Sequence, residues 1–183
     1  MPKRKEGTRS IVTKKGDQGF SYLLSGKRVS KDSPILETFG DVDELSSILA
    51  VARCQMTKTE YQKDLFDIQR VLGMACAELA ATSSHVHKLK KRINERMAKA
   101  LEKKCHALEA RNKKWKCFVT PGSSLCSAYL DHARTVARRC ERKIVTLAKC
   151  KLVTNPHLLV WFNRLSDYLY LLSRSQDKNP KKL

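Results

Sequence analysis

The stretch SAYLDHARTVARRCERKIVTLAKC, residues 127–150, combines an apolar face and a charged strip on one predicted helix. At about 100° per residue its apolar side chains fall on one arc, which predicts packing against a core. The arc consists of Tyr129, Ala133, Val136, Ala137, Cys140, Ile144 and Leu147. Arg134, Arg138 and Glu141 follow at spacings of four and three and form a strip beside the arc. This strip either contacts a neighbour or is held by ion pairs within the helix.

The outer side of the same helix carries Arg139, Arg142 and Lys143, which we expect to be simply solvated. Helical periodicity predicts four more helices. The first begins at Gly40, where Asp41 caps it and Glu44 completes a capping box, and the second begins at Thr59 with Gln62 in the box position. The third runs from about Val86 to Arg111, and the last begins at Asn155-Pro156. Because no convincing strand is visible, the fold class is predicted to be an all-α five-helix bundle.

The length of 183 residues and a hydrophobic content of 42% favour one domain. We place this domain at residues 11–176, between basic tails at 1–10 and 177–183. The seven cysteines include no C-x-x-C pair and cannot all pair, which indicates reduced thiols in an intracellular compartment. No run of eighteen apolar residues is present, so no membrane span is expected. Residues 1–10 lack the apolar centre of a secretory signal and are either the remnant of an organelle-import segment or a solvated tail.

Charge is unevenly distributed along the chain. The net charge of +19 is unusual for an enzyme of small metabolites and attracts polyanions such as nucleotides or RNA. Between Lys88 and Lys116, twelve Lys and Arg residues stand against three Glu residues. About half of the excess positive charge therefore lies in one segment.

Residues 11–33 show no helical period but contain glycines that permit turns, together with several cations and hydroxyls. Backbone N–H groups of such a loop, with ammonium groups nearby, suit a polyphosphate. The segment is not a P-loop, because Ser21 stands where the first glycine of that motif belongs and Arg28 departs from it as well. From spacing alone, a plain surface loop is an equal alternative.

Six motifs in order resemble the PduO-type ATP:corrinoid adenosyltransferases, with the G-F-S variant similar to the mitochondrial eukaryotic branch. They are T-K-x-G-D-x-G-F-S at 13–21, S-K-D at 30–32, D-E-L-S-S at 43–47, F-x-x-P-G at 118–122, R-T-V-x-R-R-x-E-R at 134–142 and N-R-L-S-D-Y-L at 163–169. The resemblance covers residues 11–174. It implies a homotrimer of five-helix bundles with active sites between subunits, and transfer of the 5′-deoxyadenosyl group of ATP to cob(I)alamin.

The resemblance also implies roles for individual residues. Those that bind the triphosphate end of ATP would be Thr13, Lys14, Gly16, Asp17, Gly19 and Lys31, with Mg²⁺ but without a metal-ligating side chain assigned. Arg138, Glu141 and Asn163 would hold the nucleotide. Phe118 would press on the lower face of the corrin, and Asp41 would pair with Arg134 of the adjacent subunit. A reductase and a cobalamin-dependent mutase are the protein partners that such an enzyme implies, in mitochondria if the source is eukaryotic.

Three departures from the family pattern concern the corrinoid more than ATP. They are Lys15 in place of Thr, Ser123 in place of the second glycine of a P-G-G turn, and the segment NKKWK at 112–116 in place of a Leu-Pro element. With the high positive charge, they favour a second hypothesis. In that hypothesis the chain has lost catalysis and serves as a structural or RNA-binding subunit of a larger assembly, such as an organellar ribosome.

Overall fold

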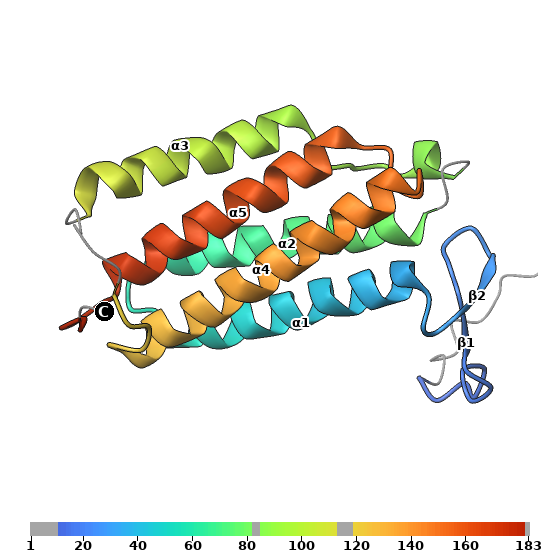
Figure 1. Cartoon of the computed structure of the whole chain (residues 1–183), viewed down its shortest axis with the longest axis horizontal. Coiled ribbons are helices and arrows are strands. Elements are labelled where there is room, and N and C mark those ends of the chain that lie inside the picture. The colour runs from blue at the N-terminus through green and yellow to red at the C-terminus, as the bar shows by residue number, and fades with distance from the viewer. Residues whose placement is uncertain (1–10, 82–84, 113–118, 182–183) are drawn as a thin grey trace, which may run out of the picture.

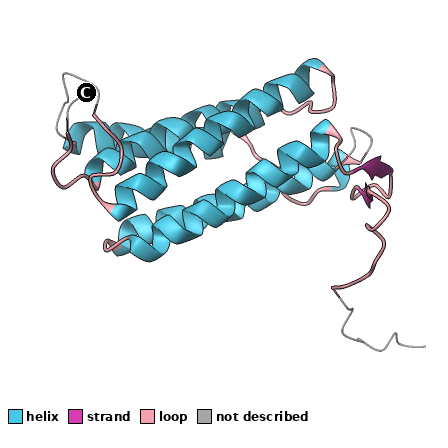
Figure 2. Cartoon of the chain, turned by 60° about the horizontal axis from the view of Figure 1, so that its bottom comes forward, coloured by secondary structure: helices cyan, strands magenta, loops and turns pink. Residues whose placement is uncertain are grey.

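The computed structural model describes residues 11–81, 85–112 and 119–181. Five helices lie alongside one another in an elongated bundle, and a small hairpin projects from one end (Figure 1). The elements are β1 (Phe20–Tyr22), β2 (Arg28–Ser30), α1 (Pro34–Gln55), α2 (Thr59–Ala80), the 3-10 turn η1 (Val86–Lys88), α3 (Glu95–Arg111), α4 (Leu125–Lys149) and α5 (Pro156–Ser175). The hairpin and the C-terminus lie at opposite ends of the bundle (Figure 2). The all-α prediction is confirmed, but the antiparallel β1–β2 pair was not predicted.

The helix α4 lies at the centre of the packing, because it contacts both α1 and α5. Its predicted apolar arc is confirmed: six of the seven side chains are buried, and only Tyr129 is half-buried against the core. The remaining helices join at the sides, α2 against α1 and α3 against α5. Burial of these apolar faces supplies the main driving force for the bundle.

Two helix starts differ from the predictions. The helix α1 begins at Pro34, six residues before Gly40, because proline suits the first helical turn. Asp41 therefore lies in the interior of α1 and cannot cap it. The helix α3 begins at Glu95 rather than near Val86, because Asn94 caps it by accepting a hydrogen bond from the Met97 amide at 3.1 Å.

The other helix starts agree with the sequence signals, although one cap does not. The helix α2 begins at Thr59 as predicted, but Gln62 donates to the Met56 carbonyl at 2.6 Å instead of completing a capping box. The helix α5 follows the Asn155 cap and Pro156 as predicted. Among the described residues, no helix is both long and apolar enough to cross a membrane.

The outer side of α4 is not simply solvated. Arg139 forms ion pairs with Asp41 and Glu44, and Lys143 forms them with Asp41 at 3.1 Å and Glu37 at 3.4 Å. All three acidic residues belong to α1, which packs along this flank of α4. The expectation of plain solvation was therefore wrong for Arg139 and Lys143. These two residues, four apart on α4, face three acidic residues that follow one another at spacings of four and three on α1.

Candidate active site

The N-terminal segment folds into a tight turn before the hairpin. The amide of Asp17 donates to the Lys14 carbonyl at 3.3 Å, and the amide of Gly19 donates to the Gly16 carbonyl at 3.2 Å. Lys14 and Gly19 both have positive φ, at 57° and 78°. Only Gly19 adopts this conformation without a steric cost, because it lacks a Cβ atom.

Lys31 ties the end of the hairpin to this turn. Its amide donates to the Gly19 carbonyl at 2.9 Å. A Cβ atom at Gly16 would lie 3.0 Å from the Lys31 Nζ atom, so the ammonium group lies directly over the glycine backbone. The structure therefore brings Gly16, Gly19 and Lys31 together, as the phosphate-binding prediction requires.

The remaining side chains of the turn are open to solvent. Thr13, Lys14 and Asp17 are exposed. An open hollow of about 770 Å³ is lined by Lys14, Lys15, Asp17, Gln18 and Tyr22. The hollow thus carries two ammonium groups and one carboxylate, and the Lys31 ammonium group lies at Gly16, next to Lys15 and Asp17 in the chain. It is large enough and cationic enough for a polyphosphate.

The charged strip of α4 meets α5 at one defined contact. Glu141 Oε1 accepts a hydrogen bond from Asn163 Nδ2 at 3.0 Å, and both side chains are half-buried. Arg138 lies one turn earlier and is exposed, with no side-chain partner among the described residues. An exposed guanidinium beside a fixed amide–carboxylate pair can bind a group that carries both hydroxyls and negative charge.

Arg164 belongs to this contact, and the sequence analysis missed it. Its Nη1 donates to Asn163 Oδ1 at 2.8 Å, so the Nδ2 side of that amide faces Glu141. Arg164 is itself held by Asp167 at 3.3 Å and by Glu102 of α3 at 3.7 Å. The signal was available, because Arg164 directly follows Asn163 in the motif N-R-L-S-D.

The two predicted intersubunit residues have partners within the chain. The Nε atom of Arg134 is 3.1 Å from Oδ1 of Asp131. Asp41 is paired with Arg139 and Lys143, as described above. Arg134 and Asp41 do not pair with each other within the described part of the chain. Phe118 lies outside the described residues.

The two candidate halves of the site lie on separate parts of one chain. The turn and hairpin project beyond the N-terminal end of α1, and α4, whose second half carries Arg138 and Glu141, runs toward the same end of the bundle (Figure 1). Across the described residues, no hydrogen bond or ion pair joins the stretch 13–33 to Arg138, Glu141 or Asn163. Within the described residues, the phosphate-binding turn and the charged strip therefore make no polar contact with each other.

Comparison with known proteins identifies the family. Residues 11–176 match the sequence profile described as cobalamin adenosyltransferase. The chain belongs to the cobalamin adenosyltransferase family. The resemblance stated from the six motifs is thereby confirmed.

Individual members of the family support this assignment. A corrinoid adenosyltransferase from Citrobacter freundii is 36% identical over 170 residues, which cover 93% of this chain and 96% of the relative. The mouse corrinoid adenosyltransferase MMAB is 32% identical over 184 residues, covering 94% of this chain and 77% of the relative. Two bacterial PduO proteins also match, and the chain spans 50% of their length.

A solved structure shares the fold over nearly the whole chain. It is a variant PduO-type ATP:corrinoid adenosyltransferase from Lactobacillus reuteri, complexed with cobalamin and ATP. The TM-score is 0.88 at 27% sequence identity, with coverage of 95% of this chain and 99% of the other. The bundle and its N-terminal segment are thus the architecture of a family member that binds both molecules.

Proposed function

We propose that the chain transfers the 5′-deoxyadenosyl group of ATP to cob(I)alamin, forming adenosylcobalamin and triphosphate. One observation carries the proposal. The exposed guanidinium of Arg138 lies beside the Glu141–Asn163 pair, whose orientation Arg164 fixes. A fixed amide–carboxylate pair beside an exposed arginine that has no side-chain partner among the described residues suits ligand binding. A purely structural contact between α4 and α5 would not require that arginine.

The reaction requires no nucleophile from the protein. The Co(I) electron pair forms a bond to the ribose 5′-carbon of ATP, while the bond from that carbon to the triphosphate oxygen breaks. The electrons of the broken bond leave with triphosphate, whose growing negative charge must be stabilised by cations and backbone donors. Lys14, Lys31 and the turn that holds Gly16 suit that task. Arg138 and Glu141 then orient the adenosine part of the nucleotide.

We further propose that the complete site forms between subunits of a homotrimer. The phosphate-binding turn and the Arg138 strip make no polar contact within the described part of one chain, which supports an arrangement in which a neighbouring chain brings its own turn to the strip. In that arrangement the outer nitrogens of Arg134 would contact Asp41 of the adjacent subunit, because Asp131 occupies only the Nε side of Arg134. Phe118 would approach the corrin from the segment before Val119.

Mg²⁺ is proposed to accompany ATP. The described residues contain no cluster of three or more His, Cys, Asp or Glu side chains that could hold a metal. Mg²⁺ commonly binds through phosphate oxygens and water with few protein ligands, and the exposed carboxylate of Asp17 beside the cationic hollow fits such a role. A reductase that supplies cob(I)alamin and a cobalamin-dependent mutase that receives the product are the proposed partners, and mitochondria are the proposed location in a eukaryote.

Anaerobic mixing with cob(I)alamin and ATP, followed by absorbance, tests the proposal directly. The spectrum should convert to that of adenosylcobalamin, with triphosphate as the second product. Gly16→Ala should raise the KM for ATP by about ten-fold, because the added Cβ displaces the ammonium group of Lys31. Gly73→Ala is the matched control, since its Cβ would meet no atom within 4 Å. Absence of turnover in the unaltered chain would refute the enzymatic proposal and favour the structural or RNA-binding hypothesis.

A further inference from the structure

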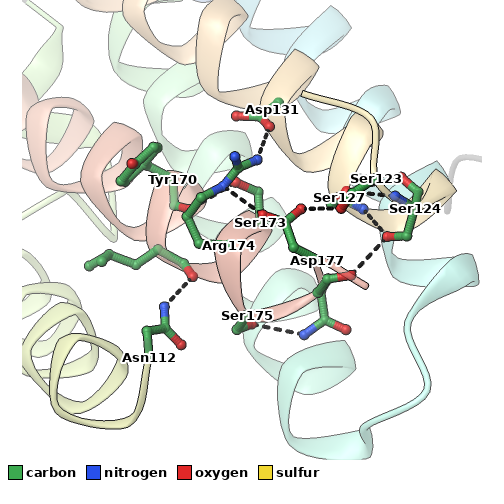
Figure 3. A network of polar contacts seen from close by, with 12 residues as sticks. Asn112, Ser123, Ser124, Ser127, Asp131, Tyr170, Ser173, Arg174, Ser175 and Asp177 are labelled. Atoms are coloured by element: carbon green, nitrogen blue, oxygen red, sulfur yellow. Dashed lines mark hydrogen bonds and ion pairs between the residues drawn. The ribbon is translucent and has the colours of Figure 1, made fainter. Parts of the chain in front are cut away.

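A continuous polar path runs from the loop at residues 119–124 to the charged strip of α4. It consists of the side chains of Ser123, Asp177, Arg174, Asp131 and Arg134. Ser123 Oγ donates to Asp177 Oδ1 at 2.6 Å, and Asp177 Oδ2 forms an ion pair with Arg174 Nε at 3.2 Å. Arg174 Nη2 donates to Asp131 Oδ2, and Asp131 Oδ1 accepts from Arg134 Nε at 3.1 Å. Figure 3 shows Arg174 between the two carboxylates, with Ser123 on the far side of Asp177.

The middle of this path is buried. The side chains of Arg174, Asp131 and Asp177 are 4%, 7% and 1% exposed. Two buried carboxylates share one buried guanidinium, so a second cation is needed to balance them. Arg134 supplies it, at 27% exposure. Arg134 is therefore held in place because it neutralises a buried carboxylate. An ion pair on the exposed surface would contribute little to the stability of the fold.

The two ends of the path face different substrates under the proposed function. Ser123 lies five residues after Phe118, in a loop that is also tied down by the hydrogen bond from the Thr120 amide to the Lys181 carbonyl at 2.8 Å. Arg134 lies one helical turn before Arg138. The path thus connects the corrin side to the nucleotide side of the proposed site.

We propose that Asp131, Arg174 and Asp177 are positioning residues that couple the corrin-side loop, through Ser123, to Arg134 on the nucleotide-binding strip. This inference rests on the proposed function. Ser123, which departs from the glycine usual in the family, is then an anchor of the loop and not an obstacle to the corrin. None of the three positioning residues needs to touch a substrate.

The first test separates positioning from general stability. Ser123→Ala removes one hydrogen bond at the loop end of the path, and we expect the KM for cob(I)alamin to rise about five-fold. The KM for ATP should rise as well, but only about two-fold, because the path passes the change on to Arg134 while Arg134 keeps its own partners. Ser175→Ala is the control: its hydroxyl, at the same end of α5, donates to the Leu172 carbonyl and accepts from Gln176 Nε2 at 2.8 Å outside the path, and its loss should change neither KM. Equal rises in both KM values, an unchanged KM for ATP, or no rise in the KM for cob(I)alamin with Ser123→Ala would overturn the proposal.

The second test asks whether the path is continuous. Asp131→Asn keeps the shape of the side chain but removes the charge shared by Arg174 and Arg134, and we expect a rise of about ten-fold in the KM for cob(I)alamin. In the double variant with Ser123→Ala, the rise should be no larger than with Asp131→Asn alone, because both changes cut one path. Rises that multiply would show two independent effects and refute the coupling. Thermal melts verify folding, and if Asp131→Asn fails to fold, the Ser123→Ala result alone decides. No turnover in the unaltered chain would instead remove the proposed function and this inference with it.

Discussion

At the scale of the residue, Arg138 is exposed although its neighbour Ala137 is fully buried. Arg138→Ala should therefore leave the thermal midpoint nearly unchanged while reducing kcat for adenosyl transfer by about 10²- to 10³-fold, the usual effect of removing one transition-state donor. Arg142→Ala is the matched control, because Arg142 is exposed on the same helix and lies away from the Glu141–Asn163 contact. Normal turnover by the Arg138 variant would remove this residue from the proposed active site.

The cysteines provide a second prediction at this scale. Burial raises the pKa of Cys76 to about 11 and the pKa values of Cys105 and Cys140 to about 12. These thiols stay protonated at neutral pH, and the thiolate is the reactive form. We expect a thiol-alkylating reagent at pH 7–8 to label the exposed Cys54 and Cys150 of the native protein. Cys76, Cys105 and Cys140 should stay unlabelled until the protein is unfolded.

Peptide mass spectrometry before and after denaturation measures this labelling. Rapid modification of Cys140 in the native protein would contradict its buried position. As pH rises towards 11–12, the buried thiols begin to ionise, so protection should weaken only in that strongly alkaline range.

Sequence predicted a side chain's position correctly where that position depends only on the periodicity of the helix that carries it. The spacing of Arg134, Arg138 and Glu141 was enough to put them on one strip. Sequence could not reveal that Asp131 is shared between Arg134 and Arg174, because those two arginines lie forty residues apart and on different helices. The role of Arg164 was likewise hidden, since it depends on how α5 faces α4.

At the scale of the element, the segment that leads into α3, together with α3 itself, carries the cations of the positively charged stretch between Lys88 and Arg111. The structure divides these cations into two groups. Arg92 and Lys104 pair with the largely buried Glu78 and Asp64, and Lys99 pairs with Glu95. The second group is exposed without a side-chain partner among the described residues and is free to contact a polyanion; it consists of Lys88, Lys90, Lys91, Arg96, Lys103 and Arg111.

An RNA-binding role would therefore draw on this second group, which includes Lys90, Lys91 and Lys103. Changing all three to Gln should lower RNA affinity and reduce the slope of log affinity against log salt by about two to three units. Adenosyl transfer should stay within about two-fold, since none of the three contacts the charged strip. The control variant changes the exposed Lys63, Lys149 and Lys151 to Gln, which removes the same charge from other elements. If both variants affect RNA binding equally, Lys90, Lys91 and Lys103 form no specific RNA-binding site and serve only to keep the surface solvated.

Helix starts show why element boundaries were only partly predictable. Asn155-Pro156 predicted the start of α5 correctly, because the Asn cap and the proline both act within the first turn of the helix. Asp41 and Glu44 matched a capping pattern, but they pair instead with Arg139 on α4. A local pattern cannot distinguish a cap from a tertiary ion pair when both use an acidic residue.

At the scale of the whole molecule, the proposed homotrimer can be tested directly in solution. Sedimentation should show a trimer at micromolar concentration, and Asp41→Asn should weaken both assembly and activity. Glu44→Gln is the control, because Glu44 also pairs with Arg139 within the chain but has no proposed partner in another subunit. A monomeric unaltered chain with full activity would refute the intersubunit site.

The assembly could not be obtained from periodicity. The sequence named both candidate halves of the site, and the structure shows no polar contact, within the described residues, between the turn containing Gly16 and the strip containing Arg138. The family resemblance supplied the expectation of a trimer. A site shared between subunits is the physical reason that we propose for it.

The attachment of α3 has a consequence for the order in which the bundle opens. This helix packs mainly against α5 and is joined to α2 through Asp64, which accepts from Lys104 of α3 at 2.5 Å and from Tyr168 of α5 at 2.9 Å. An element held along one side has a lower free energy of local opening than a central one such as α4. In native-state hydrogen exchange, the α3 amides should therefore exchange before those of α4, and Lys104→Ala should accelerate α3 alone. Simultaneous exchange of both helices would show that the bundle opens as one cooperative unit.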